Sequence, residues 1–229
     1  MPGTNITMLQ KVANGLGDLN ESVVYVGGSV AELYVTDTAA TEVRPTVDID
    51  CVVELASYKN FYELEDILRK KKFRNDTTSG APICRWLYNG VSVDIMPNDE
   101  KIIGFTNKWY KSGMLNKIEK ILPDNRTIFV FPTEYYIATK LEAVNGRGGS
   151  DLRTSHDFED IVYILNNCPE FVEQVSIIDN KDLKDYLGEQ FTLFLANPNI
   201  KEAIECVLPY GEGERTDIVY EVMKKLSSN

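Results

Sequence analysis

Two closely spaced aspartates are the residues of this sequence best suited to chemistry. Asp48 and Asp50 stand two apart in the apolar run TVDIDCVVEL, so on a strand their side chains share one face, while Val47, Ile49 and Cys51 face the other way. Two like charges at such a place are costly unless a cation compensates them. Mg²⁺ prefers oxygen ligands and is usually held by one or two carboxylates together with substrate phosphates. The pair therefore predicts a divalent metal site.

A third aspartate follows in VSVDIMP, the second arm of a hairpin. The turn of that hairpin is Asn89-Gly90, among the strongest short-range hairpin signals. If the second arm lies beside the strand of Asp48 and Asp50, Asp94 completes a cluster of three carboxylates able to hold two metal ions. The plainer alternative is that each aspartate marks a strand end exposed to water.

A glycine pair lies about twenty residues ahead of the acids. Gly27 and Gly28 end the strand-like run SVVYV, and Ser29 opens a segment with helical spacing. Backbone N–H groups at such a turn can approach a phosphate closely, and a helix N-terminus favours negative charge. The turn is neither a Walker loop nor GxGxxG, and GGS alone occurs in many ordinary turns. Its partnership with an acid pair on the next strand is what predicts phosphate binding.

These motifs together resemble the DNA polymerase β-like nucleotidyltransferase superfamily. The shared pattern is a GGS turn, then the segment R-x-T-x-D-x-D, then an aspartate on a third strand. The residues Arg44 and Thr46 ahead of the acid pair are similar to those of the AbiEii/AbiGii toxin-like and MenT-like branch. The resemblance covers residues 20–167. The connection from GGS to the acid pair, which includes residues 36–43, is long for the family.

The same branch carries a lysine on a later helix and then a helix with two aspartates three residues apart. Here PTEYYIATKLEAVNGR supplies Lys140 and Arg147, and SHDFEDIVYIL supplies Asp157 and Asp160. The chain departs from the branch at His156, where Lys or Arg is usual. Lys140 could instead be a surface lysine whose stem covers apolar neighbours, and Asp157 could be a first-turn charge that stabilises the helix dipole.

The resemblance implies an enzyme that moves a nucleoside monophosphate from an NTP to a hydroxyl and releases pyrophosphate. It implies that Asp48, Asp50 and Asp94 hold Mg²⁺ or Mn²⁺ and are catalytic, and that Lys140 stabilises the leaving pyrophosphate. The residues expected to bind the nucleotide are Gly27, Gly28, Ser29, Arg44, Thr46, Lys140 and Asp157. Charge neutralisation and in-line positioning are what such a transfer requires.

The acceptor and the biological role stay open. The acceptor could be tRNA, a protein or a small molecule, and the enzyme could be the toxin of a toxin-antitoxin system with a cognate antitoxin as partner. One alternative is a catalytically decayed nucleotide-binding or interaction module, in which Asp94 would point away from the other two acids. Another is an antibiotic-modifying nucleotidyltransferase, which predicts a carboxylate-lined pocket beside the metals.

The elements that must position these residues follow from hydrophobic periodicity. Strands are expected at 22–28, 46–55, 81–97 (a hairpin) and 126–132, and helices at 7–19, 29–37, 58–73, 132–144, 155–167, 169–178, 181–196 and 215–228. The sequence therefore predicts an α+β nucleotidyltransferase fold, a small mixed β-sheet flanked by helices in residues 1–131, followed by a C-terminal helical bundle in residues 132–229.

Composition narrows the class of protein. A net charge of −11 and a pI near 4.7 disfavour a general nucleic-acid binder, although RKKKFR at 69–74 and the lysines spread over 101–126 favour local contact with RNA. For the run 69–74, a solvated helix end whose cations complement the helix dipole is the favoured alternative. The four cysteines form no CxxC pair and are expected to be reduced and structural. No apolar run is long enough to cross a membrane and the start lacks a leader pattern, so a soluble, cytoplasmic protein is expected.

Overall fold

The chain forms two compact units. The structure, a computed structural model, describes residues 5–35, 40, 42–55, 57–147 and 151–228. The first unit, called here the sheet unit, comprises Met1–Val30 and Arg44–Pro132, and the second, the helical unit, comprises Ala31–Val43 and Thr133–Asn229. The sequence did not assign residues 31–43 to the helical part. Of the long connection at 36–43, residues 36–39 and 41 lie outside the described residues.

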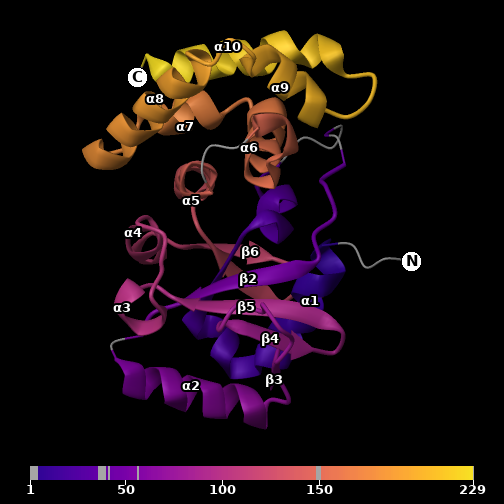
Figure 1. The fold of residues 1–229 in the computed structure, drawn as a ribbon, viewed down its shortest axis with the longest axis vertical. Coiled ribbons are helices and arrows are strands. Elements are labelled where there is room, and N and C mark those ends of the chain that lie inside the picture. The colour runs from indigo at the N-terminus through magenta and orange to yellow at the C-terminus, as the bar shows by residue number, and fades with distance from the viewer. Residues whose placement is uncertain (1–4, 36–39, 41, 56, 148–150, 229) are drawn as a thin grey trace. The chain divides into compact units, whose positions relative to one another are not determined.

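The sheet unit is built on a mixed sheet in which the described residues form seven strands, in the order β3-β4-β5-β2-β1-β7-β6 (Figure 1). The strands are β1 Val23–Val26, β2 Asp48–Val53, β3 Arg74–Asn75, β4 Arg85–Tyr88, β5 Val91–Pro97, β6 Ile118–Ile121 and β7 Thr127–Val130. Strand β2 is parallel to β5, β1 is parallel to β7, and the other neighbours are antiparallel. This confirms an α+β protein with a mixed sheet.

The predicted hairpin is present with the predicted turn. Asn89 and Gly90 both have positive φ, 46° and 79°, as a two-residue hairpin turn requires. A second hairpin, β6–β7, was predicted only in its second arm. Strand β6 is mostly exposed, and because it lies at the edge of the sheet it carries lysine and glutamate in place of the buried alternation that marks a central strand.

Helices α1 and α2 of the sheet unit confirm their predictions. The helices of this unit are α1 Asn5–Leu16, α2 Tyr58–Lys70, α3 Glu100–Ile103 and α4 Tyr110–Leu115, with the 3-10 helix η1 Gly17–Ser22. In α2 the buried residues are Phe61, Leu64 and Leu68. Ile67, expected on the same face, is 40% exposed, because its position falls at the margin of the apolar stripe. The short helices α3 and α4 were not predicted.

The helical unit contains the rest of the α-helices. They are α5 Thr133–Gly146, α6 His156–Asn167, α7 Phe171–Ser176, α8 Lys181–Leu195, α9 Ile200–Val207 and α10 Thr216–Ser227, with 3-10 helices η3 Leu152–Thr154 and η4 Gly213–Arg215. Two of these helices have side-chain caps: the Ser155 hydroxyl accepts from Phe158 N, and the Asn180 side chain accepts from Leu183 N. Helix α9 was missed by the sequence.

The helix after the glycine turn, η2 Gly28–Tyr34, is of the 3-10 type, and the two units divide within it. Its last residue belongs to the helical unit for a visible reason. The ring of Tyr34 lies 4.7 Å from that of Tyr136, and the Cys168 thiol donates to the Tyr34 carbonyl at 3.4 Å. These contacts attach residues far apart in sequence to one core.

Three other predictions concern surface and core. The four cysteines are free, and all but Cys206 are buried, as expected of structural thiols. In the run 69–74, Arg69 and Lys70 form the last turn of α2, where Arg69 pairs with Glu65 and Asp66, as expected of a solvated helix end, and Arg74 begins β3. Within the described part of the chain, no helix combines the length and the apolar character that a membrane crossing needs.

Candidate functional site

Strand pairing brings the three aspartates of the sheet unit onto one face. Strands β2 and β5 are in a parallel register that sets Asp50 opposite Asp94, and cross-strand partners point to the same side of a sheet. Asp48, two residues before Asp50, shares that side, whereas Ile49 and Cys51 are fully buried on the other. Asp94 therefore points toward the other two acids, which the decayed-module alternative did not predict.

The expected alternation fails at one position. Val47 was expected to share the buried side with Ile49, but it is 84% exposed. Strand β2 begins only at Asp48, so Val47 precedes the ladder and its side chain is not held against the core.

An arginine that the sequence did not single out completes this row of side chains. Arg85 on β4 lies directly opposite Asp94 on β5. Its Nε donates to Asp94 Oδ1 at 2.8 Å, and its Nη2 donates to Asp94 Oδ2 at 2.7 Å and to Asp48 Oδ2 at 3.0 Å. The hydrogen bonds to Asp94 raise the pKa of Arg85, so the guanidinium stays charged. We call Asp48, Asp50, Asp94 and Arg85 the strand cluster.

Arg85 could have been found from the turn alone. A two-residue hairpin loop fixes the register of both arms. Counting outward from Asn89-Gly90 pairs Tyr88 with Val91 and, three steps further, Arg85 with Asp94, which is the observed register. The missing step was to pair the acid of one arm with the cation of the other.

The glycine turn lies against the strand cluster. Val26, the last residue of β1, is opposite Asp50, so Gly27 follows directly beside that carboxylate. Gly27 has φ 74°, and a Cβ built there would overlap Asp50 Oδ2. Only glycine meets both the positive φ and the close approach.

Gly28 is crowded from the other side by the segment that precedes β2. A Cβ at Gly28 would overlap Arg44 Nη2 and would lie 2.9 Å from Thr46 Cγ2. The structure thus brings together the glycine turn, Arg44, Thr46 and Asp50, which are distant in sequence and were predicted to share a site.

Asn5 holds this segment in place and was missed by the sequence. Asn5, the buried first residue of α1, donates from Nδ2 to Arg44 O at 3.1 Å and accepts from Thr46 N at 3.0 Å. The Thr46 hydroxyl donates to Asp48 O at 3.2 Å. The buried amide of Asn5 thereby supplies hydrogen bonds to the backbone of Arg44 and Thr46, which precede β2.

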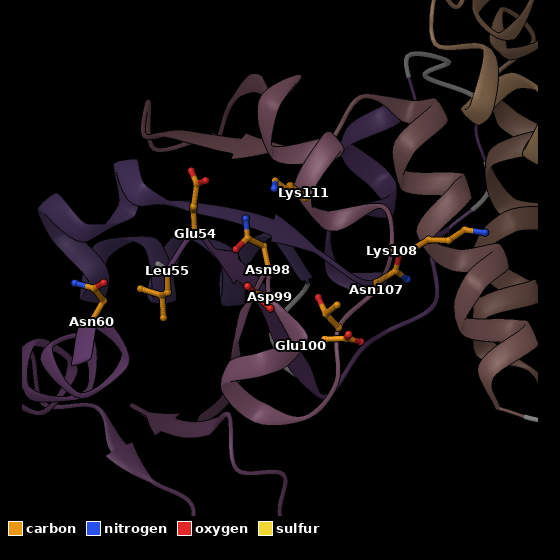
Figure 2. A pocket seen from close by; sticks show the side chains of 10 residues that line it. Glu54, Leu55, Asn60, Asn98, Asp99, Glu100, Asn107, Lys108 and Lys111 are labelled. Atoms are coloured by element: carbon orange, nitrogen blue, oxygen red, sulfur yellow. The ribbon is translucent and has the colours of Figure 1, made fainter. Parts of the chain in front are cut away.

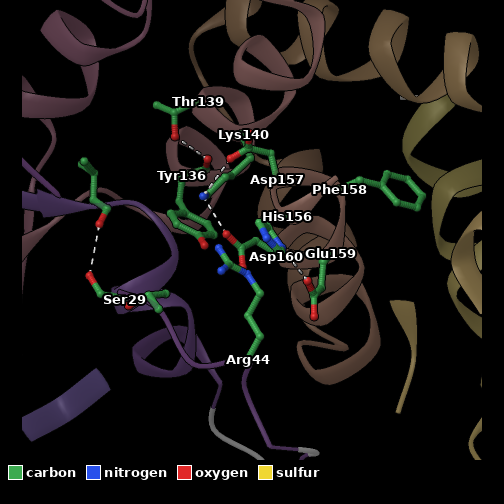
Figure 3. Close-up of polar contacts among 12 residues, drawn as sticks. Ser29, Arg44, Tyr136, Thr139, Lys140, His156, Asp157, Phe158, Glu159 and Asp160 are labelled. Carbon is green, nitrogen blue, oxygen red and sulfur yellow. Dashed lines mark hydrogen bonds and ion pairs between the residues drawn. The ribbon is translucent and has the colours of Figure 1, made fainter. Parts of the chain in front are cut away.

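Ser29 is buried, and its hydroxyl faces the chain itself. Its Oγ lies 3.5 Å from the Val26 carbonyl oxygen, to which it donates (Figure 3). The hydroxyl is therefore directed at the backbone of the turn. The phosphate contact predicted for Ser29 would have to come from its backbone N–H.

The helical unit holds a second charged cluster, around Lys140 of α5. Its Nζ lies 3.1 Å from Asp157 Oδ1 and 2.6 Å from Asp160 Oδ2, both on α6 (Figure 3). Arg147 Nη1 lies 2.6 Å from Asp157 Oδ2. We call these four residues the helix cluster. The side chains of Lys140, Asp157 and Asp160 are 7%, 6% and 1% exposed, so Lys140 is not the surface lysine considered as an alternative.

His156 stands where the family has a basic residue, and it is exposed. Its Nδ1 lies 3.2 Å from Glu159 Oε2, one turn along the same helix. It does not join the helix cluster through any contact that the structure records, and the sequence assigned it no catalytic role.

The strand cluster offers the oxygen ligands that Mg²⁺ prefers, and Arg85 already uses three of those oxygens. Among the residues described, no group of three or more His, Cys, Asp or Glu side chains is arranged to hold a metal ion. The carboxylates thus suit Mg²⁺ by their chemistry, but in this structure Arg85 holds their oxygens and they are not arranged around an ion. The nearby thiols do not compete, because burial raises the pKa of Cys51 strongly and that of Cys84 to about 12.

A separate cleft of about 800 Å³ opens at the other end of β2 and β5 (Figure 2). Residues of both charges line it, among them Glu54, Asp99, Lys108 and Lys111. Glu54 lies four residues after Asp50, which along a strand is roughly 13 Å. The cleft therefore begins beyond the strand cluster, and none of the three candidate metal ligands lines it.

No protein-family model matches the chain, and no curated protein is similar enough to it to count as a relative. The resemblance to nucleotidyltransferases therefore rests on the motifs themselves.

Proposed function

We propose that this protein is a metal-dependent nucleotidyltransferase with a nucleotidyltransferase fold. The observation that carries the proposal is the placement of Asp48, Asp50 and Asp94 on one face of adjacent strands, with the Gly27–Gly28 turn against Asp50. Metal-binding acids beside a turn that only glycine can occupy suit a nucleoside triphosphate, which needs both charge neutralisation and close approach of backbone N–H groups.

The acids and the glycine turn of the sheet unit would have separate roles. Asp48, Asp50 and Asp94 would hold Mg²⁺ or Mn²⁺, and the turn at Gly27, Gly28 and Ser29 would cradle phosphates. The bound metal would neutralise the triphosphate and lower the pKa of the acceptor hydroxyl. That hydroxyl would lose its proton to solvent and bond to the α-phosphorus, while the bond to the bridging oxygen breaks and pyrophosphate leaves.

The roles of Arg44, Thr46, Lys140 and Asp157 in nucleotide binding stay predictions from the resemblance. For Arg44 and Thr46 the support is their contact distance from Gly28. For Asp157 it is the ion pair with Lys140, which would fix the lysine in one orientation.

Transfer of label from an NTP tests the function. The full chain is incubated with each α-³²P-labelled NTP, Mg²⁺ or Mn²⁺, and in turn total tRNA, cell protein and aminoglycosides. We expect metal-dependent labelling of one acceptor class, lost in Asp48→Ala. Asp217→Ala is the control, because Asp217 is an exposed aspartate paired with Lys201. Equal labelling by wild type and Asp48→Ala would refute the proposal.

The second candidate function is a nucleotide-binding module without transfer. The observation that favours it is the Arg85 bridge between Asp48 and Asp94, because a decayed metal site can be closed by an internal ion pair. Nucleotide binding that needs no divalent ion, together with no labelling in any reaction, would select this function. The toxin role and a cognate antitoxin belong to the first candidate and depend on the acceptor found.

A further inference from the structure

Arg85 occupies the space between two candidate metal ligands. Its guanidinium is bidentate to Asp94 and reaches Asp48 with the same Nη2 that contacts Asp94. A cation held by Asp48 and Asp94 needs lone pairs on the same carboxylate oxygens, since each oxygen directs its lone pairs within the plane of the group. The guanidinium and a metal ion therefore compete for one place.

We propose that Arg85 is a built-in counter-ion that holds Asp48 and Asp94 in register until a metal-bound triphosphate displaces it. This inference rests on the proposed function. It makes Arg85 a positioning residue whose displacement couples metal binding to nucleotide binding. Metal alone binds weakly, because it must expel a bidentate arginine. Metal and nucleotide together bind well, because a phosphate offers the displaced guanidinium a bidentate partner of the same geometry.

The surroundings of Arg85 permit the exchange. Its side chain is 25% exposed and that of Asp48 is 27% exposed, so water and phosphate can reach both. Strand β4, which carries Arg85, pairs with β5 through only four residues and on its other side with the two-residue strand β3. Arg85 thus lies near the β3–β4 edge of the sheet, where a long side chain can change rotamer without disturbing the core.

The proposal predicts a thermodynamic coupling between metal and triphosphate. If Arg85 must leave the carboxylates for the metal and gains a phosphate when the nucleotide binds, each ligand favours the other by the same factor. Neutralising Arg85 removes the competitor and also the phosphate partner. Metal affinity in the absence of nucleotide should then rise, and the coupling should fall.

The experiment measures Mn²⁺ binding to the full chain by electron paramagnetic resonance, with and without the α,β-methylene analogues of the four NTPs. Arg85→Met is compared with wild type. Arg153→Met is the matched control, because Arg153 also bridges two acids, with bonds of 2.5 to 2.9 Å to Asp151 and of 2.9 Å to Glu202. We expect Arg85→Met to bind Mn²⁺ alone about tenfold more tightly than wild type and Arg153→Met.

The outcomes separate the inference from the function. Equal Mn²⁺ affinity of wild type and Arg85→Met, with binding lost in Asp50→Asn, overturns the role of Arg85 and leaves the metal site standing. Absence of Mn²⁺ binding in all variants overturns both. Should Arg85→Met melt at lower temperature because Asp48 and Asp94 repel each other, Mn²⁺ should raise its melting temperature more than that of wild type, and failure to do so also counts against the proposal.

Discussion

The two charged clusters of this protein use the same residue types in opposite ways. In the strand cluster, Asp48 and Asp94 share one guanidinium, and both Asp48 and Arg85 are about a quarter exposed. In the helix cluster, two cations, Lys140 and Arg147, serve Asp157 and Asp160, and the lysine and both acids are almost fully buried. The strand cluster is partly open to water, although its Asp94 side chain is only 10% exposed, and the helix cluster is closed except at Arg147, which is 72% exposed.

The difference matters because burial changes what an ion pair does. A buried pair that loses one partner leaves an uncompensated charge in a medium of low dielectric constant, so its members cannot exchange partners cheaply. A partly exposed pair is screened and can be replaced by water or a ligand at small cost. We therefore interpret the strand cluster as a place for exchange with ligands. The helix cluster is a fixed connection between α5 and α6, which would hold Lys140 in one orientation in the proposed function.

The largest expected effect is on stability and comes from Lys140→Met. Removal of the ammonium leaves Asp157 and Asp160 buried with one partner fewer, which should cost about 3–5 kcal/mol of unfolding free energy. Urea unfolding of the full chain followed by circular dichroism measures the loss.

Two variants accompany this measurement. Lys181→Met, at an 83% exposed lysine paired with Asp185, should change the unfolding free energy by about 0.5 kcal/mol or less. The triple variant Lys140→Met, Asp157→Asn, Asp160→Asn should recover part of the loss, because the buried charges are gone. A Lys140→Met protein as stable as wild type would remove the contrast between the clusters.

The next effect is on function and comes from Asp50→Asn. The amide keeps the shape of the carboxylate and removes its charge, so Mn²⁺ binding should be lost and nucleotidyl transfer should fall by about 10²-fold or more. Stability should change by less than about 1 kcal/mol, since Asp50 itself is only partly buried. Loss of folding without a change in Mn²⁺ affinity would instead make the strand cluster structural, like the helix cluster.

A smaller effect is expected from Gly27→Ala, for which the chain offers a matched control. Gly27 and Gly90 have nearly equal φ, 74° and 79°, but a Cβ at Gly27 would overlap the Asp50 carboxylate, whereas nothing lies within 4 Å of one at Gly90. Each substitution should cost about 1–2 kcal/mol for the left-handed conformation, and Gly27→Ala should cost more than Gly90→Ala because its Cβ must displace the Asp50 carboxylate. Only Gly27→Ala should also weaken Mn²⁺ binding. Equal effects on Mn²⁺ affinity would mean that the turn does not shape the strand cluster.

The smallest effect concerns pH and Glu134, in the first turn of the helix that carries Lys140. Burial raises the pKa of Glu134, so the folded chain binds its proton more tightly than the unfolded chain does. Stability is therefore lost as pH rises from the ordinary pKa of a glutamate to the raised value, and stays lower above it. Glu134→Gln removes this dependence.

The melting temperatures of wild type and Glu134→Gln, compared between pH 4 and pH 7, measure this effect. The glutamine variant should gain relative to wild type as pH rises, by about 0.5 kcal/mol. A gap that narrows toward pH 7 would show that the charged carboxylate of Glu134 is stabilised in place. The expected gain would instead extend the closed character of the helical unit beyond the helix cluster.

Much of the fold could be predicted from the sequence, because the signals were local. Periodicity placed α1, α2 and most of the C-terminal helices, and Asn89-Gly90 placed the hairpin. Elements with weak local signals were missed: β6 is an exposed edge strand, and α3, α4 and α9 are short. Ahead of β2, the position of Arg44 and Thr46 depends on Asn5, some forty residues away, and no local pattern reports such a contact.

For the candidate site, the sequence by itself determined that Asp48 and Asp50 share a face, and through the hairpin register it also determined that Arg85 lies opposite Asp94. Only the tertiary structure decided that β2 and β5 pair in parallel with Asp50 opposite Asp94, and that Lys140 lies between Asp157 and Asp160. The physical reason is the range of the forces. Side-chain alternation and turn geometry act over a few residues, whereas parallel pairing across an intervening helix and hairpin is set by burial of the whole sheet.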